Sequence, residues 1–270
     1  MRRVWGVVPH IVLVLFSAGI ALPLLWVLRV SLTDKLTAYQ IPPQWAAQPH
    51  LDNYIEIFTA YPFAGWFLNS LIVALVSTLI CLPLATTLAY AFARHDTGGP
   101  PLRLTVLASQ MLPPIVLVLP LFAIFLGAGL LNTRFAIIMA HVALNLPFLA
   151  WMLVAFFEGE VKQLEEAARI EGATRLRAFR EVAVPVAAPG ILAAGLLGFI
   201  LSWNEFLFAL ILSGKATATL PVGLSTLETH RGVEIALLAA ASLTAILPVF
   251  VLLPFLRKYL IKGLSLGALK

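Results

Sequence analysis

The sequence predicts an all-α fold, a polytopic membrane helix bundle with six transmembrane helices. Of the 270 residues, 61% are hydrophobic and only 11% are charged, and the mean hydropathy is +0.97. Soluble domains carry about 25% charged residues, so a water-soluble globule of this composition could not cover its surface with polar groups. The alternating segments of about ten residues that build membrane β-barrels are absent. Six apolar runs are present, at residues 7–30, 67–93, 104–129, 135–157, 191–212 and 235–256.

Each run is long enough to cross a membrane as a helix, because about 20 residues at about 1.5 Å each span about 30 Å of hydrocarbon. The first run follows Arg2 and Arg3, as a signal peptide would. It is longer than the apolar region of a signal peptide, and residues 28–31 offer no small-residue cleavage site, so we interpret it as a retained span. Several prolines fall inside the runs, among them Pro23, Pro83, Pro113, Pro114, Pro120, Pro147 and Pro248. Prolines there favour a bend, which could serve packing or act as a hinge.

Basic residues set the predicted orientation. Six spans place both termini on one side, and 13 of the 18 Lys and Arg residues fall on that side. The positive-inside rule therefore predicts a multi-pass membrane protein with both termini in the cytoplasm. The net charge of +5 is then explained by orientation and contact with membrane lipid headgroups, and we expect no nucleic-acid partner.

The sequence lacks the motifs of an enzyme. No P-loop motif for binding nucleotide phosphates is present. Cys81 is the only cysteine, which excludes an intramolecular disulfide, and no Cys/His cluster has metal-site spacing. We therefore expect this chain to have no catalytic activity and no cofactor or metal site of its own.

Residues 158–187 differ from the rest of the chain because they carry eleven of its 31 charged residues. Two apolar stripes follow the helical repeat. They are Val161, Leu164 and Ala168, then Leu176, Phe179 and Val182. Gly172 between them is suited to a left-handed turn, and Pro185 is expected to end the second helix. A helix pair on the membrane surface is one interpretation, but the mixed charge favours docking into a groove of another protein.

The same loop resembles the EAA motif of ABC importer permeases. Glu166-Ala167-Ala168, Gly172 and Val182-x-Val184-Pro185 keep the spacing of that motif, with Val in place of Ile and of Leu. The resemblance runs from about residue 67 to the C-terminus. It implies the type I ABC importer permease fold, in which this loop is the coupling helix that docks on an ATPase. The implied docking residues are Glu165, Glu166, Ala167, Ala168, Gly172, Ala173, Leu176, Phe179 and Pro185.

This resemblance also implies a location in the bacterial cytoplasmic (inner) membrane, a domain organisation and a set of partners. Residues 1–66 form the first transmembrane helix and a periplasmic segment, residues 67–257 form the transmembrane core with the loop 158–187, and residues 258–270 form a cytoplasmic tail. The implied partners are a second permease subunit, in a heterodimer, an ATPase dimer that holds ATP and Mg, and an extracytoplasmic solute-binding protein.

The segment 202–206, Ser-Trp-Asn-Glu-Phe, and the tail 263–270 are similar to the smaller maltose-type carbohydrate permease subunit. This similarity implies that the chain forms half of a pathway for a sugar or an oligosaccharide. A non-sugar solute is the alternative, and an ion-coupled secondary transporter is a weaker one, because it would depend on Glu205 alone as a buried carboxylate.

Polar residues in the spans are candidates for this pathway. They are Asn145, Asn204 and Glu205, and the spans also carry the polar residues His141, Gln110 and Ser109. An ionised carboxylate in hydrocarbon costs about 2.5–3.5 kcal/mol, so Glu205 should face the bundle interior or water. Hydrogen bonding between helices would explain the same residues. In the external segment, Gly214, Lys215 and Thr217 correspond by resemblance to a loop that reaches the binding protein, although a plain hairpin connection would also fit.

Overall fold

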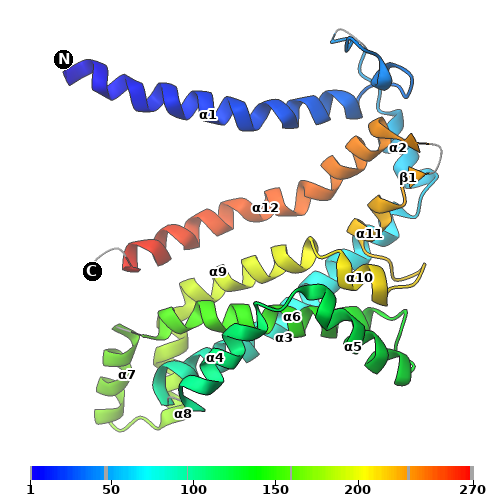
Figure 1. Cartoon of the computed structure of the whole chain (residues 1–270). Coiled ribbons are helices and arrows are strands. Elements are labelled where there is room, and N and C mark those ends of the chain that lie inside the picture. Colours follow the sequence, from blue (N-terminus) through cyan, green and yellow to red (C-terminus); the bar gives the residue numbers. More distant parts are fainter. Residues whose placement is uncertain (1, 46–47, 96, 159, 230–231, 268–270) are drawn as a thin grey trace. The chain divides into compact units, whose positions relative to one another are not determined.

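The computed structural model describes residues 2–45, 48–95, 97–158, 160–229 and 232–267, and nearly all of its regular structure is helical (Figure 1). The described helices of the N-terminal half are α1 (Arg2–Ser31), η1 (Thr37–Tyr39), α2 (Asp52–Thr59), α3 (Phe63–His95), α4 (Gly99–Ser109) and α5 (Pro114–Gly127). Those that follow are α6 (Arg134–Phe157), α7 (Glu160–Ile170), α8 (Arg175–Ala178), η2 (Phe179–Ala183), α9 (Val184–Trp203), α10 (Leu207–Leu212), α11 (Leu220–Ser225) and α12 (Ile235–Gly267). One short antiparallel pair joins β1 (Glu228–Thr229) to β2 (Gly232–Val233).

The chain divides into two compact units. The first comprises residues 1–64 and 223–247, and the second comprises residues 65–222 and 248–270. The predicted boundary at residue 66 lies close to the first break, but residues 223–247 group with the N-terminal segment and not with the core. The predicted tail, 258–270, begins inside α12, which continues to Gly267.

Polar contacts hold the first unit together around the C-terminal end of α1. The amide of Asn53 donates to the carbonyls of Ser31 and Thr33, at 2.9 and 2.8 Å. Lys35 pairs with Glu56 at 2.6 Å and with Glu234 at 3.1 Å. The apolar stretch of α1 itself, Pro9–Ser31, has none of its most hydrophobic window buried within the chain, so lipid or another protein must cover it.

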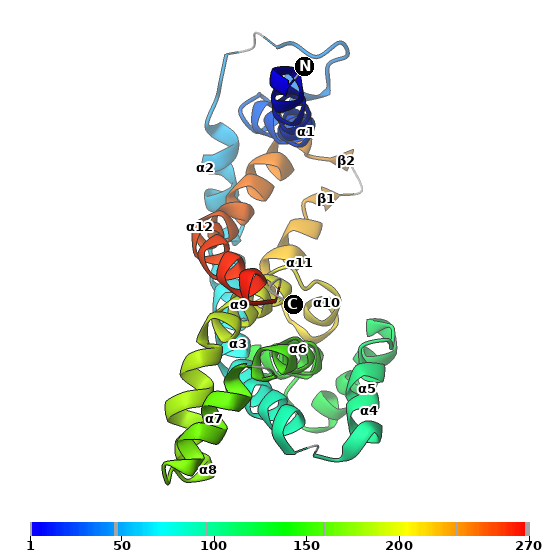
Figure 2. The same ribbon diagram turned by 90° about the vertical axis from the view of Figure 1, so that its left-hand side faces the viewer.

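Close packing of α6 and α9 forms the centre of the second unit (Figures 1 and 2). A Cβ atom at Gly198 would lie 2.9 Å from Leu149 of α6, and one at Gly190 would lie 2.4 Å from the ring of Phe156. Small residues at these positions allow the two backbones to approach, as is common between membrane helices. The core therefore depends on packing between α6 and α9 rather than on an amphipathic face.

Five described helices are long and apolar enough to cross a membrane, and a sixth span results if α4 and α5 count as one. The predicted third span, 104–129, is broken into two helices, because α4 and α5 meet at an angle of 93°. Pro113 has extended backbone angles and Pro114 opens α5. Neither proline has an N–H to donate, and each disfavours helical geometry in the residue before it, so the two together break the helix.

The predicted fifth span, 191–212, is wrong at both ends. Helical structure runs without interruption from Arg175 to Trp203, and the chain then turns before α10. The prediction that Pro185 ends a helix is also wrong, because Pro185 lies in the first turn of α9. The π-helical turn of η2 explains this: the N–H of Val184 donates to the carbonyl of Phe179, five residues back, and the widened turn accommodates the proline.

Candidate functional site

A glycine turn ends the first helix of the charged loop. Gly172 has a φ of 97°, its N–H donates to the carbonyl of Arg169 at 3.1 Å, and the N–H of Ala173 donates to that of Ala168 at 3.0 Å. This pair of bonds is the Schellman motif, in which a residue without a Cβ satisfies the last free carbonyls of a helix. The predicted left-handed conformation of Gly172 is confirmed.

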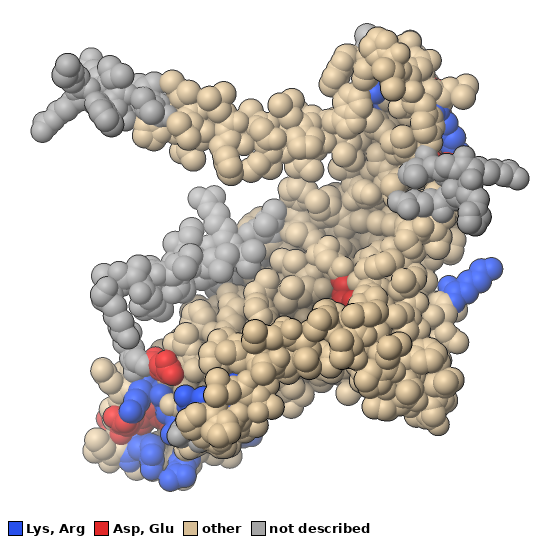
Figure 3. Space-filling view, viewed as in Figure 1, with Lys and Arg blue, Asp and Glu red and all other residues tan. Residues whose placement is uncertain are grey.

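The second helix of the loop starts directly after this turn. The side chain of Thr174 accepts a hydrogen bond from the N–H of Arg177 at 3.3 Å and so caps α8. The predicted helix, glycine turn and second helix are therefore present, and both helices lie together at one end of the second unit (Figure 1). Charged side chains of both signs gather at this end (Figure 3).

The structure divides the predicted docking residues between the surface and the interior of the loop. Glu166, Ala167 and Leu176 are exposed, Leu176 at 57%, while Ala168, Ala173 and Phe179 are partly buried. Glu165 is buried, and Pro185 lies farther along, in α9. Sequence reasoning missed Ile170, which ends α7 and is 88% exposed. Ile170 could have been found from the sequence, because it is an apolar residue of the charged loop that belongs to neither stripe.

Glu165 is held by two residues of α3. One carboxylate oxygen accepts from Nε of Arg94 at 2.7 Å and the other accepts from the hydroxyl of Tyr90. The ring of Tyr90 packs against Phe157 and Phe179, with centroids 5.7 and 4.5 Å away. Glu165 and Phe179 therefore connect the loop to the helix bundle instead of belonging to its outer surface.

A second polar cluster lies inside the bundle around His141 of α6, which is completely buried. Its Nδ1 lies 2.6 Å from the hydroxyl of Ser202, and its Nε2 lies 3.1 Å from a carboxylate oxygen of Glu205. Ser202 in turn bonds to Ser77 of α3 at 3.0 Å. The cluster thus joins α3, α6 and the end of α9.

Glu205 also occupies the break between α9 and α10. Its carboxylate accepts the N–H groups of Phe208 at 3.0 Å and Ala209 at 3.2 Å, which are free donors of the first turn of α10. A negative charge at a helix start is favourable because of the exposed N–H dipoles. The expectation that Glu205 faces the bundle interior is confirmed, and these bonds account for its charge without a substrate.

The other two candidate pathway residues differ in their surroundings. Asn204 is exposed, and its amide donates to the carbonyl of Ile200 at 2.8 Å, on its own helix. Asn145 is buried on α6, one turn after His141. Sequence reasoning noted His141 as a polar residue of the fourth span but did not pair it with Glu205, and it missed Ser77 of α3, which reaches the cluster through Ser202.

The turn containing Gly214, Lys215 and Thr217 is tied to the bundle by hydrogen bonds. Thr217 accepts from the N–H of Gly214 at 2.9 Å and donates to the carbonyl of Asn132 at 3.2 Å. Asn69 of α3 donates to the carbonyls of Ala216 and Ala218 at 3.0 and 2.9 Å. Of the three predicted contact residues, Lys215 is exposed, while Gly214 and Thr217 are partly buried.

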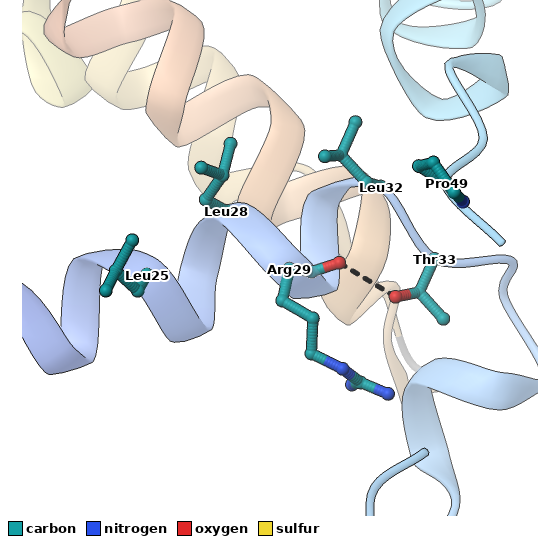
Figure 4. Close-up of a pocket in the computed structure, with 6 residues that line it drawn as sticks. All are labelled: Leu25, Leu28, Arg29, Leu32, Thr33 and Pro49. Atoms are coloured by element: carbon teal, nitrogen blue, oxygen red, sulfur yellow. Dashed lines mark hydrogen bonds between the residues drawn. The ribbon is translucent and has the colours of Figure 1, made fainter. Parts of the chain in front are cut away.

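Two cavities have mainly apolar walls. One, of about 310 Å³, lies at the C-terminal end of α1 and is lined by Leu25, Leu28, Arg29, Leu32, Thr33 and Pro49 (Figure 4). Figure 4 shows the Arg29 guanidinium extending away from α1. That guanidinium lies 5.4 Å from the ring of Trp26 and 5.7 Å from that of Trp45, an arrangement typical of a membrane interface.

The other cavity, of about 500 Å³, lies between α3, α9 and the second half of α12. Thr78 is the one polar side chain among the residues that line it. Sugar sites need several convergent hydrogen-bonding groups, so these walls suit hydrocarbon better. Within the described ranges, no group of three or more His, Cys, Asp or Glu residues could hold a metal ion.

Apolar helices of membrane-spanning length, joined by a charged helix pair, define a multi-pass membrane protein. Residues 82–265 match the family described as binding-protein-dependent transport system inner membrane component, and the chain belongs to this family. It is a permease subunit of an ABC importer, as the sequence predicted.

Relatives at 35–36% identity cover most of the chain. It is 36% identical over 251 residues to the sulfoquinovosyl glycerol transport system permease protein SmoH of Agrobacterium fabrum, covering 92% of this chain and 88% of that protein. It is 35% identical over 255 residues to the trehalose transport system permease protein SugB of Mycobacterium tuberculosis, covering 92% of each.

A solved structure shares the fold. It is a chain of a bacterial ABC transporter involved in the import of the acidic polysaccharide alginate, with a TM-score of 0.74 at 21% identity, covering 95% of this chain and 96% of that one. The predicted type I importer permease fold is thereby confirmed.

Proposed function

We propose that this permease subunit forms half of the translocation pathway for a sugar or an oligosaccharide. The observation that carries the proposal is the set of relatives with carbohydrate names. SmoH and SugB are named for a sulfoquinovosyl glycerol and for trehalose. A third relative, the arabinooligosaccharides transport system permease protein AraQ of Halalkalibacterium halodurans, is 35% identical over 223 residues, which cover 82% of this chain and 79% of that protein.

The energy for transport comes from an ATPase dimer that binds the loop 158–187. The exposed side chains around the Gly172 turn support this: Glu166, Ala167, Ile170 and Leu176 present a small apolar surface with a charged rim. Helix ends of this shape are suited to a groove in a partner. ATP and Mg then belong to the partner, since the sequence has no P-loop.

The remaining partners follow from the membrane placement. Both termini and the loop 158–187 face the cytoplasm, on the side with 13 of the 18 basic residues. The external turn around Lys215 then faces the solute-binding protein. A second, different permease subunit supplies the other half of the pathway.

Closing of the ATPase dimer would move the docked loop and, through it, the bundle. The breaks at residues 110–113 and 204–206 are the places where helices can change direction without breaking further backbone hydrogen bonds. Alternating access then needs only movement of helical segments about positions where the backbone hydrogen bonds of the helix are already interrupted.

The test is uptake by the complete complex in proteoliposomes, with ATP inside and the binding protein outside. A panel of labelled di- and oligosaccharides is compared with labelled spermidine and phosphate. We expect ATP-dependent uptake of one carbohydrate and no uptake driven by a proton or sodium gradient alone. ATP-dependent uptake of a non-sugar solute would refute the substrate class, and gradient-driven uptake by this chain alone would refute the ABC mechanism.

A further inference from the structure

We propose that Glu165, Arg94 and Tyr90 form a strut that sets the orientation of α7 on the cytoplasmic end of α3, which makes Glu165 and Arg94 positioning residues for coupling. This inference rests on the proposed function of the loop as the ATPase contact. It identifies the contact through which movement of the docked loop is passed to α3. The docking surface alone does not identify this contact.

The geometry of the strut leaves α7 little freedom. Nε of Arg94 holds one oxygen of Glu165 at 2.7 Å, and the Tyr90 hydroxyl holds the other oxygen. With both oxygens engaged from one helix, the carboxylate cannot rotate without breaking a bond. Tyr90 is itself fixed between the rings of Phe157 and Phe179. Residues of α3, α6, α7 and η2 thus meet at one point.

Burial shows that stability alone is a poor explanation for this pair. The side chains of Arg94 and Glu165 are each 7% exposed. The two terminal nitrogens of Arg94 are buried and have no hydrogen-bond partner in the part of the chain that the structure describes. Removing an ion pair from water costs several kcal/mol per ion, and apolar residues of similar volume often stabilise a protein as well or better. A carboxylate bonded through both of its oxygens fixes the orientation of α7, whereas an apolar contact would not.

The position of the pair suits the transmission of movement. Glu165 faces inward, while Glu166 and Ile170, which share another face of α7 at i and i+4, are exposed. Arg94 lies in the last turn of α3, the 33-residue helix that also carries Ser77 of the buried polar cluster. A pull on the exposed face of α7 therefore reaches a membrane-spanning helix through one side-chain contact.

The loop contains its own control. Arg177 and Glu181 form an ion pair of nearly the same length, 2.8 Å against 2.7 Å, but their side chains are 66% and 61% exposed. Exposed pairs at i and i+4 contribute little because water and salt screen them. Glu181→Gln removes a charge of the same kind from the same loop without touching the strut.

The decisive variant replaces both ions by similar apolar volumes, Glu165→Met with Arg94→Met. This change leaves no unpaired buried charge, so the complex should assemble at the wild-type level, judged by copurification of the ATPase. The measured quantity is the number of substrate molecules transported per ATP hydrolysed in proteoliposomes. We expect that ratio to fall by at least about fivefold, the lower end of ordinary coupling effects. Tyr90→Phe should lower it less, and Glu181→Gln should leave it within about twofold.

The outcomes separate the strut from the proposed function. A wild-type ratio in the double methionine variant would overturn the strut alone. Failure of both the double methionine variant and Tyr90→Phe to assemble would assign these residues to folding and also overturn it. Absence of ATP-driven uptake by the wild-type complex would overturn the proposed function and the strut with it.

Discussion

Replacing Gly172 by Asp tests the role of the charged loop, because the structure allows its local cost to be worked out. The φ of Gly172 is 97°, and a Cβ added there would have no heavy atom within 4 Å. The cost within the chain is thus limited to backbone strain of about 1–2 kcal/mol. Domains typically unfold at about 5–15 kcal/mol, so the variant should insert and accumulate. We expect uptake to fall at least about tenfold, because about 1.4 kcal/mol of lost docking energy already has that effect.

Gly129 supplies a matched control for this strain. It has a φ of 67°, its Cβ position is equally open, and its turn has the same pair of hydrogen bonds, from Gly129 to Leu126 and from Leu130 to Phe125. Gly129→Asp therefore carries the same type of strain and charge at the end of α5, outside the loop. The assay is uptake per unit of complex in the membrane, with copurification of the ATPase. Wild-type uptake in Gly172→Asp, or an equal loss in Gly129→Asp, would refute the reasoning.

Further predictions concern the buried cluster, the two exposed surfaces and the first unit. Glu205→Gln should weaken the bond to His141 and lower the thermal stability of the complex by about 1.5–3 kcal/mol, whereas Asn204→Ala, at an exposed position, should not; equal effects would contradict the cluster. Cys81 is buried and should not react, so crosslinks can be assigned to an introduced cysteine. A cysteine at Ala173 is expected to crosslink to the ATPase and one at Lys215 to the binding protein; the reverse pattern would contradict the orientation. Hydrogen bonding to Glu56 raises the pKa of Lys35 in the folded protein. The charged Lys35 therefore stabilises the fold fully below its unfolded pKa of about 10.4, and this stabilisation is lost as the pH rises through the higher folded pKa. The Lys35 side chain is 45% exposed, so Lys35→Met should cost less than about 1 kcal/mol at pH 8, and this difference in thermal unfolding should shrink above about pH 11.

Local signals in the sequence determined the class of fold, the approximate spans and the shape of the charged loop. An apolar run long enough to span hydrocarbon implies a helix wherever it packs, because a backbone in lipid must satisfy its own hydrogen bonds. Gly172 could likewise be assigned to a left-handed turn, since the Schellman motif involves residues only a few positions apart. The family followed from motif spacing along the same loop, and the comparisons confirm it.

Tertiary structure decided which polar groups meet and which faces remain exposed. Glu165 belongs to the charged loop by sequence, yet it turns inward because Arg94 and Tyr90, more than 70 residues earlier, reach it from α3. The contact between His141 and Glu205 joins residues 64 positions apart. Such pairings depend on how helices pack and rotate, and the helical repeat of one segment contains no information about its neighbour. Local pattern sets each helix, whereas side-chain packing between helices selects the partners of each buried charge.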